Sequence, residues 1–177
     1  MNKWLDVDPL EVAYQALMNS SEDIRPLRKL QSIQTLIYSL RPPGGVNLNH
    51  SRDIMNMPKV SVVIPTYGGA EFLGEAIQSV LRQTYQDFEL IVVNDASPDA
   101  TDEVVRQFDD PRLRYIKHEQ NRGVANARKT GVMQSRGAFI AHLDQDDFFH
   151  PEKLQAHVDY LDQHPDVGFT YNSRYEL

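Results

Sequence analysis

The sequence predicts an α/β fold: a mostly parallel sheet with helices on both of its faces. From residue 59 onward, short runs rich in Val, Ile and Leu alternate with amphipathic stretches of helical length. Such apolar runs are typical of strands buried on both faces, and strands separated by helices usually pair in parallel. The chain has 177 residues, 41% hydrophobic and 24% charged, so it can bury the core of one domain with an appendage.

Residues 1–40 are expected to form a separate α-helical segment. Apolar residues recur there at three- and four-residue spacing, first in residues 5–17 and then, after the capping residue Ser21, in residues 24–40. This stripe has three interpretations that the sequence leaves open. It packs on the main domain, it mediates self-association through residues 5–40, or it belongs to another module.

A linker is expected at residues 41–58, before a main domain at residues 59–177. The run Arg41-Pro42-Pro43-Gly44-Gly45 ends the preceding helix, because proline cannot continue a helix and glycine loosens the chain. In the main domain, apolar runs predict strands at residues 60–64, 88–93, 113–116, 138–143 and 167–171. Helical periodicity predicts helices at residues 70–83, 99–108, 123–135 and from Pro151 onward, with Pro151 at the first helical position.

The composition argues against several classes of protein. A net charge of −7 argues against a nucleic-acid binder, which needs clustered Lys and Arg. The absence of cysteine excludes disulfides and thiolate metal sites. No apolar run approaches the length of a membrane span, and the acidic N-terminus is unlike a signal peptide. We therefore expect a soluble, cytoplasmic protein with no membrane span in this chain.

Three polar loops directly follow predicted strands, at residues 65–67, 94–97 and 144–147. In open parallel sheets, ligands bind in a crevice at the carboxyl ends of the strands. The three loops are therefore expected to converge on one crevice.

The loop at residues 144–147 predicts a metal site. Its carboxylates Asp144, Asp146 and Asp147 follow a buried strand and would repel one another unless a cation lay between them. Mg²⁺ or Mn²⁺ carried by a phosphorylated ligand is the natural candidate, because hard cations prefer oxygen ligands. The alternative is an acidic turn that only caps a helix.

The other loops carry groups that suit a nucleotide. A planar base can stack on Tyr67, and the Asp95 carboxylate can accept the imide N–H of uracil. Arg122 and Arg128 are cations that could reach a diphosphate, with a surface ion pair as the alternative. Asp99 is expected to cap a helix. Neither a P-loop nor G-x-G-x-x-G occurs, which argues against ATP and dinucleotide sites.

Four motifs, in this order, resemble those of the family 2 glycosyltransferases of the GT-A fold. They are VSVVIPTY at residues 60–67, VVNDASPD at 92–99, Asn121-Arg122-Gly123 with Ala127-Arg128, and LDQDD at 143–147. Each motif alone is weak evidence, but four with the right order and spacing are strong evidence. The similarity begins at about residue 59, and residues 1–57 have no counterpart in the pattern.

The resemblance implies the Rossmann-like, nucleotide-binding half of that fold. Its nucleotide-binding residues would be Pro65, Thr66, Tyr67, Asp95, Asn121, Arg128, Asp144 and Gln145. Among these, Thr66, Tyr67 and Asp95 would hold the base, most often uracil, and Asp144 would bond the ribose hydroxyls.

The same resemblance implies a role for each acid of the last motif. Asp146 would ligate Mg²⁺ or Mn²⁺, with Asp144 and Asp147 as further contributors. Asn94 stands where the family usually has a first Asp, so the charge of that position is missing here.

The implied activity is transfer of a sugar from a nucleotide-diphosphate donor, usually a UDP-sugar, to an acceptor hydroxyl with inversion. The acceptor would be a saccharide, lipid or protein, with polysaccharide biosynthesis as the expected setting. The catalytic base of this family lies well downstream of the metal motif, so we expect it beyond Leu177. The chain would then be the donor-binding part of a longer enzyme, truncated on its acceptor-binding side. Asp159, Asp162 and Asp166 are expected to be surface charges.

Two alternatives to a glycosyltransferase remain. A catalytically silent nucleotide-binding or interaction module would act through its N-terminal helices. Nucleotidylyl transfer on a related sheet would need Lys or Arg in the first loop, and Thr66-Tyr67-Gly68-Gly69 has neither.

Overall fold

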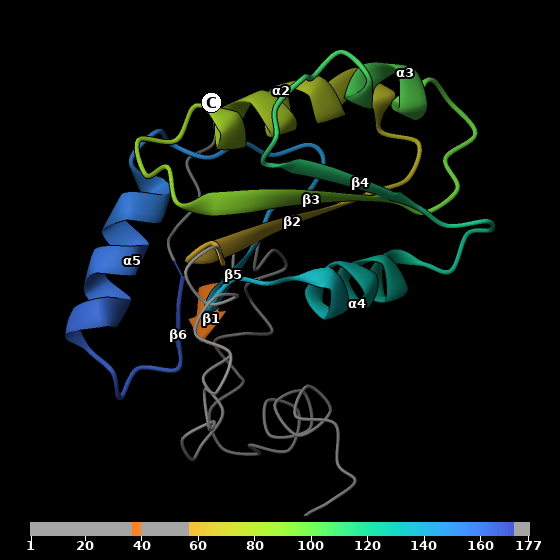
Figure 1. Cartoon of the computed structure of the whole chain (residues 1–177). Helices are drawn as coiled ribbons and strands as arrows, with labels where there is room; N and C mark the ends of the chain where they lie inside the picture. The colour runs from red at the N-terminus through yellow and green to blue at the C-terminus, as the bar shows by residue number, and fades with distance from the viewer. Residues whose placement is uncertain (1–36, 40–56, 172–177) are drawn as a thin grey trace, which may run out of the picture. The chain divides into compact units, whose positions relative to one another are not determined.

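A six-stranded sheet, in the order β4-β3-β2-β5-β1-β6, organises the described part of the chain (Figure 1). The structure is a computed structural model that describes residues 57–171 and the backbone of residues 37–39. The strands are β1 (Ile37–Ser39), β2 (Val60–Thr66), β3 (Phe88–Asn94), β4 (Leu113–Lys117), β5 (Phe139–His142) and β6 (Phe169–Thr170). The helices are α2 (Ala70–Leu81), α3 (Thr101–Val105), α4 (Val124–Gln134) and α5 (Lys153–Gln163). None of the helices among these residues is long and apolar enough to cross a membrane.

Strands β4, β3, β2 and β5 are parallel to one another. The chain runs outward from β2 through β3 to β4, and then returns to place β5 on the other side of β2. The strand order therefore changes direction between β2 and β5, which is where open α/β sheets bind ligands. The predicted α/β fold, with a mostly parallel sheet between helices, is confirmed.

The two ends of the described chain differ from the prediction. Residues 37–39, expected at the end of an N-terminal helix, form β1, which is antiparallel to β5. The spacing of apolar residues indicates only a weak preference for a helix. Hydrogen bonding to a neighbouring strand can override that preference. β6 spans two residues and is antiparallel to β1, so it does not extend the parallel part. The rest of the expected helical segment, most of the linker expected at residues 41–58 and the predicted self-association lie outside the described residues.

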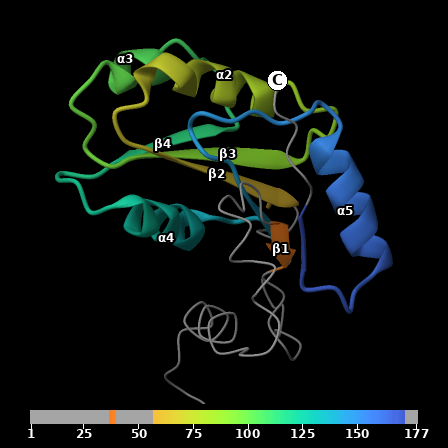
Figure 2. The same cartoon turned by 180° about the vertical axis from the view of Figure 1, so that it is seen from behind.

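Helices cover both faces of the parallel strands. α2 and α3 lie over one face and α4 over the other, as two opposite views show (Figures 1 and 2). The core beneath α2 is built from alternate strand residues and from three helices, and includes Val60, Val62, Ile64, Leu73, Ile77, Val80, Leu90, Val92, Val105, Leu154, Val158 and Leu161. α5 begins at Lys153, so Pro151 lies in the preceding turn and not at the first helical position.

α4 packs very closely on the opposite face. Ala127 belongs to a small buried cluster with Ile91 and Val93 of β3. Gly131 lies so near β2 that a Cβ atom on it would come within 2.2 Å of Val63 Cγ1. Because no larger residue fits there without moving the helix, the position of α4 on the sheet is well defined.

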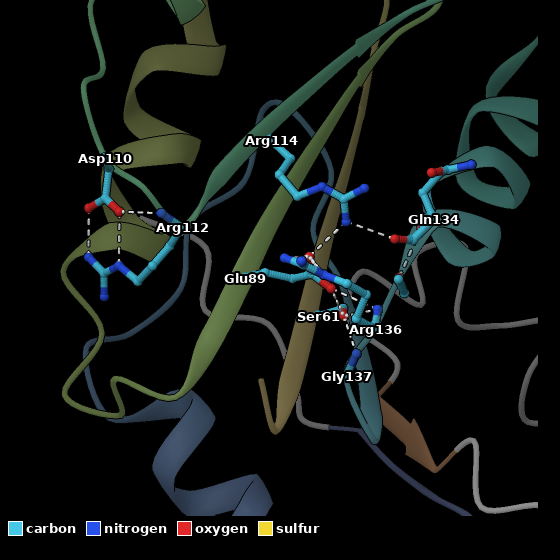
Figure 3. Close-up of polar contacts among 10 residues, drawn as sticks. Ser61, Glu89, Asp110, Arg112, Arg114, Gln134, Arg136 and Gly137 are labelled. Carbon is cyan, nitrogen blue, oxygen red and sulfur yellow. Dashed lines mark hydrogen bonds and ion pairs between the residues drawn. The ribbon is translucent and has the colours of Figure 1, made fainter. Parts of the chain in front are cut away.

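Glu89, near the amino end of β3, is a buried carboxylate that ties the C-terminal end of α4 to the sheet (Figure 3). Its Oε1 atom accepts hydrogen bonds from Ser61 Oγ and from the backbone N–H of Arg136, both at 2.7 Å. Its Oε2 atom accepts from Arg114 Nη1 at 2.8 Å and from Arg136 Nη2 at 2.9 Å. Arg114 also donates to the carbonyl of Gln134, the last residue of α4. The helix is therefore held at one end while its first turn borders the loops at the other end of the sheet.

Candidate functional site

A cleft of about 430 Å³ lies at the carboxyl ends of β2, β3 and β5, beside the first turn of α4. Its lining comes from the three predicted loops, from the turn before α4 and from α4 itself: Pro65, Thr66, Tyr67, Asp95, Asn121, Gly123, Val124, Ala127, Arg128, Asp144, Gln145 and Asp146. The structure thus brings together all eight residues predicted to bind a nucleotide, and Asp146 with them. Asp147 is not among the described residues that line the cleft.

The first loop of the cleft is bonded to the third. The Oε1 atom of Gln145 accepts hydrogen bonds from Thr66 Oγ1 at 2.7 Å and from the backbone N–H of Tyr67 at 2.9 Å. Thr66 is 2% exposed, whereas Tyr67 is 50% exposed. Thr66 therefore supports the loop from inside, and the ring of Tyr67 is the accessible surface.

The first loop is also bonded to the second. Ser97 Oγ accepts a hydrogen bond from the N–H of Gly68 at 3.1 Å, and Asp99 Oδ2 accepts one from the N–H of Ala70 at 2.9 Å. Asp99 Oδ1 accepts from both the hydroxyl and the N–H of Thr101. These bonds from Thr101 and Ala70 hold the pKa of the Asp99 carboxyl below its ordinary value. Asp99 thus accepts hydrogen bonds from the first residues of α2 and α3. The N-cap of α3 is Ala100, however, so Asp99 lies one residue before the predicted capping position.

Asp95 is a buried carboxylate that shapes the turn before α4. Its Oδ1 atom accepts hydrogen bonds from His118 Nδ1 at 2.6 Å and from the N–H of Arg122 at 2.9 Å, and its Oδ2 atom accepts from the N–H of Gly123 at 2.7 Å. Burial raises the pKa of Asp95, but these hydrogen bonds outweigh burial and leave the pKa below its ordinary value. Asp95 is therefore ionised at neutral pH and fixes the Arg122-Gly123 turn.

His118 is a supporting residue that sequence reasoning did not single out. Its ring is nearly buried, with Nδ1 facing Asp95 and Nε2 2.9 Å from Thr130 Oγ1 on α4. With a hydrogen on Nδ1, the ring donates to the Asp95 carboxylate, and Nε2 pairs with the Thr130 hydroxyl. His118 directly follows β4, so the rule that selected the three loops could have indicated it as well.

Asn94, the residue before Asp95, lies outside the lining of the cleft within the described chain. Its Nδ2 atom donates to Asp102 Oδ1 at 3.1 Å and to the Tyr115 hydroxyl at 2.6 Å, and its Oδ1 atom accepts from the N–H of Ser97 at 2.7 Å. A carboxylate here would face Asp102 and repel it. Asn94 therefore supports the second loop without a charge.

Ala96, in the same loop, has a left-handed backbone with φ of 60°. Ala96→Gly is expected to raise the free energy of unfolding by about 0.5–1 kcal/mol, because alanine is strained in this region and glycine is not. Urea unfolding at neutral pH measures the change. Ala156→Gly, at an exposed alanine inside α5, is the control, since glycine in a helix interior should lower the free energy of unfolding instead. Equal changes in the two variants would contradict the prediction.

The acid turn, residues 144–147, faces a single arginine of the lining. Arg128 Nη2 donates to Asp144 Oδ1 at 2.5 Å. Asp146 is exposed at the cleft, and the N–H of Asp147 bonds to the Asp144 carbonyl at 3.2 Å, which closes the turn. Arg122, the other candidate cation, contributes its backbone to Asp95 and does not line the cleft among the described residues. The lining is therefore rich in carboxylates, and a diphosphate would need a cation to bind there.

The family model described as Glycosyl transferase family 2 matches residues 61–176. The chain belongs to this family. The match includes the three loops and α4, so the whole lining of the cleft lies within it.

Relatives of the family 2 chain include a named glucosyltransferase, and similar solved structures hold nucleotide sugars. Escherichia coli WfgD, a UDP-Glc:alpha-D-GlcNAc-diphosphoundecaprenol beta-1,3-glucosyltransferase, is 36% identical over 118 residues, which are 67% of this chain and 46% of WfgD. S. aureus TarS 1–349 in complex with UDP-GlcNAc matches with a TM-score of 0.58 and 30% identity, over 60% of this chain and 32% of that one. Pyrobaculum calidifontis mannosyltransferase PcManGT, in complex with GDP-Man and Mn²⁺, matches with a TM-score of 0.55 and 28% identity. This match covers 59% of this chain and 32% of PcManGT. The chain spans 17–46% of the length of these and other curated relatives that it matches.

The acid turn of this family 2 chain fits part of a metal site. No three His, Cys, Asp or Glu side chains form a metal-binding group within the described residues. Divalent cations that bind with phosphates usually take only one or two protein carboxylates, however, and complete their ligands from the phosphates and water. Asp146, exposed at the cleft, and Asp144 beside it offer such oxygens.

Proposed function

We propose that this chain is the donor-binding part of a metal-dependent, inverting glycosyltransferase that uses a UDP-sugar. The observation that carries the proposal is the single cleft, which joins an exposed aromatic ring, a buried carboxylate and an acid turn on a family 2 chain. TarS in complex with UDP-GlcNAc and PcManGT in complex with GDP-Man and Mn²⁺ support a nucleotide-sugar donor. The donor-binding part would comprise residues 59–177 together with β1, because residues 37–39 pair with β5 in the same sheet.

Uracil suits the base end of the cleft. The exposed ring of Tyr67 offers a face for stacking. The Asp95 carboxylate has about four acceptor sites, and His118, Arg122 and Gly123 supply three donors to it. The remaining capacity would accept the imide N–H of uracil. Cytosine and adenine present an acceptor at the equivalent ring position, so a carboxylate would disfavour them.

The diphosphate end of the cleft would be formed by Asp144, Asp146 and Arg128. We propose that Asp146 ligates the metal ion and that Asp144 bonds the ribose hydroxyls and lies beside the ion. Asp147 would support these two residues. When bound, Mg²⁺ or Mn²⁺ would neutralise charge on the leaving diphosphate. Arg128 orients Asp144 through their ion pair and adds positive charge near the diphosphate.

In the proposed reaction, the acceptor hydroxyl oxygen bonds to the anomeric carbon as the bond from that carbon to the UDP oxygen breaks. Attack from the face opposite UDP inverts the configuration, and a carboxylate base takes the hydroxyl proton. We place this base outside the described residues, since Asp159, Asp162 and Asp166 are exposed and none lines the cleft. The acceptor would be a saccharide, lipid or protein hydroxyl.

Calorimetry with UDP, in the presence and absence of Mn²⁺, tests the proposal on the 177-residue chain. We expect wild type to bind UDP more tightly with Mn²⁺ than without it, and more tightly than CDP. Asp146→Asn should weaken the Mn²⁺-dependent binding at least about tenfold, because even contacts outside the ligand sphere of a metal site are worth that much.

The control for Asp146→Asn is Asp166→Asn, which changes an exposed aspartate outside the cleft and should bind like wild type. Absence of UDP binding by wild type would reject the proposed function. UDP binding that Mn²⁺ and Asp146→Asn both leave unchanged would reject its metal dependence.

A further inference from the structure

We propose that Gln145 is a positioning residue that holds the base loop, residues 66–69, against the acid turn, residues 144–147. Both segments line the cleft, and the inference rests on the proposed function, in which one segment serves the base and the other the diphosphate. Gln145 would then set how strongly the nucleoside part of the donor contributes to binding.

The amide of Gln145 pairs with the backbone of Tyr67. Its Oε1 atom accepts from the Tyr67 N–H at 2.9 Å, and its Nε2 atom lies 3.4 Å from the Tyr67 carbonyl oxygen. The same Oε1 atom accepts from the Thr66 hydroxyl at 2.7 Å. An acceptor and a donor on one short planar group are what an amide side chain provides, and a carboxylate would supply the acceptor alone.

Packing adds to these hydrogen bonds. A Cβ atom on Gly69 would lie 2.2 Å from Gln145 Oε1, so the glutamine amide occupies the space that a side chain at Gly69 would need. On its far side the base loop is bonded to Asp95, whose N–H donates to the Thr66 carbonyl at 2.8 Å. Gln145 therefore connects the acid turn to the wall that carries both Tyr67 and Asp95.

A residue that positions the base loop differs from one that binds the diphosphate directly. Without the Gln145 amide, Tyr67 loses the acceptor of its N–H, and its ring loses a defined place beside the base. The ion pair of Arg128 with Asp144 and the exposed carboxylate of Asp146 do not involve that amide. Loss of Gln145 should thus weaken a ligand with a base and spare a ligand without one.

Calorimetry with Mn²⁺, using UDP or inorganic pyrophosphate, makes this distinction on the 177-residue chain. Gln145→Ala should raise the Kd for UDP about tenfold, which matches the loss of one or two hydrogen bonds, and change the Kd for pyrophosphate less than about twofold. Gln145→Glu keeps the acceptor for Thr66 and Tyr67, and its added charge acts on both ligands. Because glutamate cannot donate to the Tyr67 carbonyl, the ratio of the Kd for UDP to the Kd for pyrophosphate should lie between the ratios of wild type and Gln145→Ala. Gln107→Ala, at an exposed glutamine outside the cleft, is the matched control.

Amide hydrogen exchange of Tyr67 gives a measurement that needs no ligand. Exchange should accelerate in Gln145→Ala and stay slow in Gln145→Glu and Gln107→Ala. If wild type binds pyrophosphate but not UDP, the proposed function fails and the inference fails with it. If wild type binds both and Gln145→Ala weakens both equally or neither, or leaves Tyr67 exchange unchanged, the inference alone is overturned.

Discussion

Replacing Glu89 by alanine is expected to lower the free energy of unfolding by about 3 kcal/mol and the midpoint of thermal unfolding by roughly 6–12 °C. The carboxylate is 2% exposed and accepts hydrogen bonds from Ser61, Arg114 and Arg136. Its removal leaves the N–H of Arg136 without this partner inside the protein, and each such loss costs about 1–3 kcal/mol. Urea unfolding at pH 7 measures the change.

Glu103→Ala is the matched control for Glu89→Ala. Glu103 is exposed on α3, and its ion pair with Arg106 has a separation of 3.8 Å. Surface changes of this kind usually alter the free energy of unfolding by less than about 0.5 kcal/mol. The loss of unfolding free energy in Arg114→Ala should lie between the losses in Glu89→Ala and Glu103→Ala, because Arg136 still pairs with Glu89. Similar unfolding midpoints for Glu89→Ala and Glu103→Ala would show that the buried cluster does not stabilise the fold.

The same carboxylate makes stability depend on pH in a defined direction. Burial raises the pKa of Glu89, but the hydrogen bonds from Ser61, Arg114 and Arg136 outweigh burial and lower it below its ordinary value. A carboxyl whose pKa is lower in the folded than in the unfolded state stabilises the fold above the unfolded pKa of about 4.3, and loses that contribution as the pH falls through the folded pKa. Below about pH 4.5, wild type should therefore lose stability more steeply than Glu89→Ala. Parallel pH profiles would contradict this.

The parallel part of the fold could be predicted because it depends on short-range patterns. Apolar runs of four to seven residues specify buried strands, and three- and four-residue spacing specifies helices. The loops of the cleft followed from a topological rule about strand ends, which needs no knowledge of side-chain contacts. β1 was mispredicted because a segment as short as Ile37-Tyr38-Ser39 suits either structure, and the choice depends on pairing with β5, about a hundred residues away in the chain.

The side-chain partners could not be predicted, since they join residues far apart in the sequence. The family resemblance implied that Gln145 binds the nucleotide, and this stays a prediction. Its hydrogen bonds to Thr66 and Tyr67, 79 and 78 residues earlier, had no signal in the local sequence. Nothing in the local pattern around Glu89 distinguishes a buried acid from an acid at the edge of a strand. Its burial follows from Arg114 and Arg136, which approach only when α4 and β4 are in place.

Strand β3 carries a buried carboxylate near each end, and the two hold opposite ends of α4. Glu89, near the amino end, accepts the N–H of Arg136 just after the helix. Asp95, just past the carboxyl end, accepts the N–H groups of Arg122 and Gly123 just before it. One end of this arrangement is distant from the cleft and the other forms part of its lining. A substitution at Glu89 should therefore lower stability without weakening nucleotide binding, whereas a substitution at Asp95 should affect both.

Asp95→Asn is expected to lower the free energy of unfolding by about 2 kcal/mol and to raise the Kd for UDP, measured with Mn²⁺, at least about tenfold. Asparagine has the size of aspartate but replaces one acceptor oxygen with an NH₂ donor. Two of the groups that face the carboxylate, the N–H groups of Arg122 and Gly123, are backbone donors and cannot reverse their polarity. His118 can exchange its tautomer, so the NH₂ group would turn toward its ring and leave one oxygen for the turn.

That remaining oxygen would be taken up by Arg122 and Gly123, which leaves no carboxylate charge to accept the imide N–H of a base. Urea unfolding and calorimetry on the same samples measure both effects. Asp109→Asn, at an exposed aspartate outside the cleft, is the control for the chemical change. Glu89→Ala is the control for stability, because it should unfold more easily than Asp95→Asn yet bind UDP within about threefold of wild type where it is folded. If the two variants lose UDP affinity in proportion to their loss of stability, Asp95 acts on the fold and not on the base.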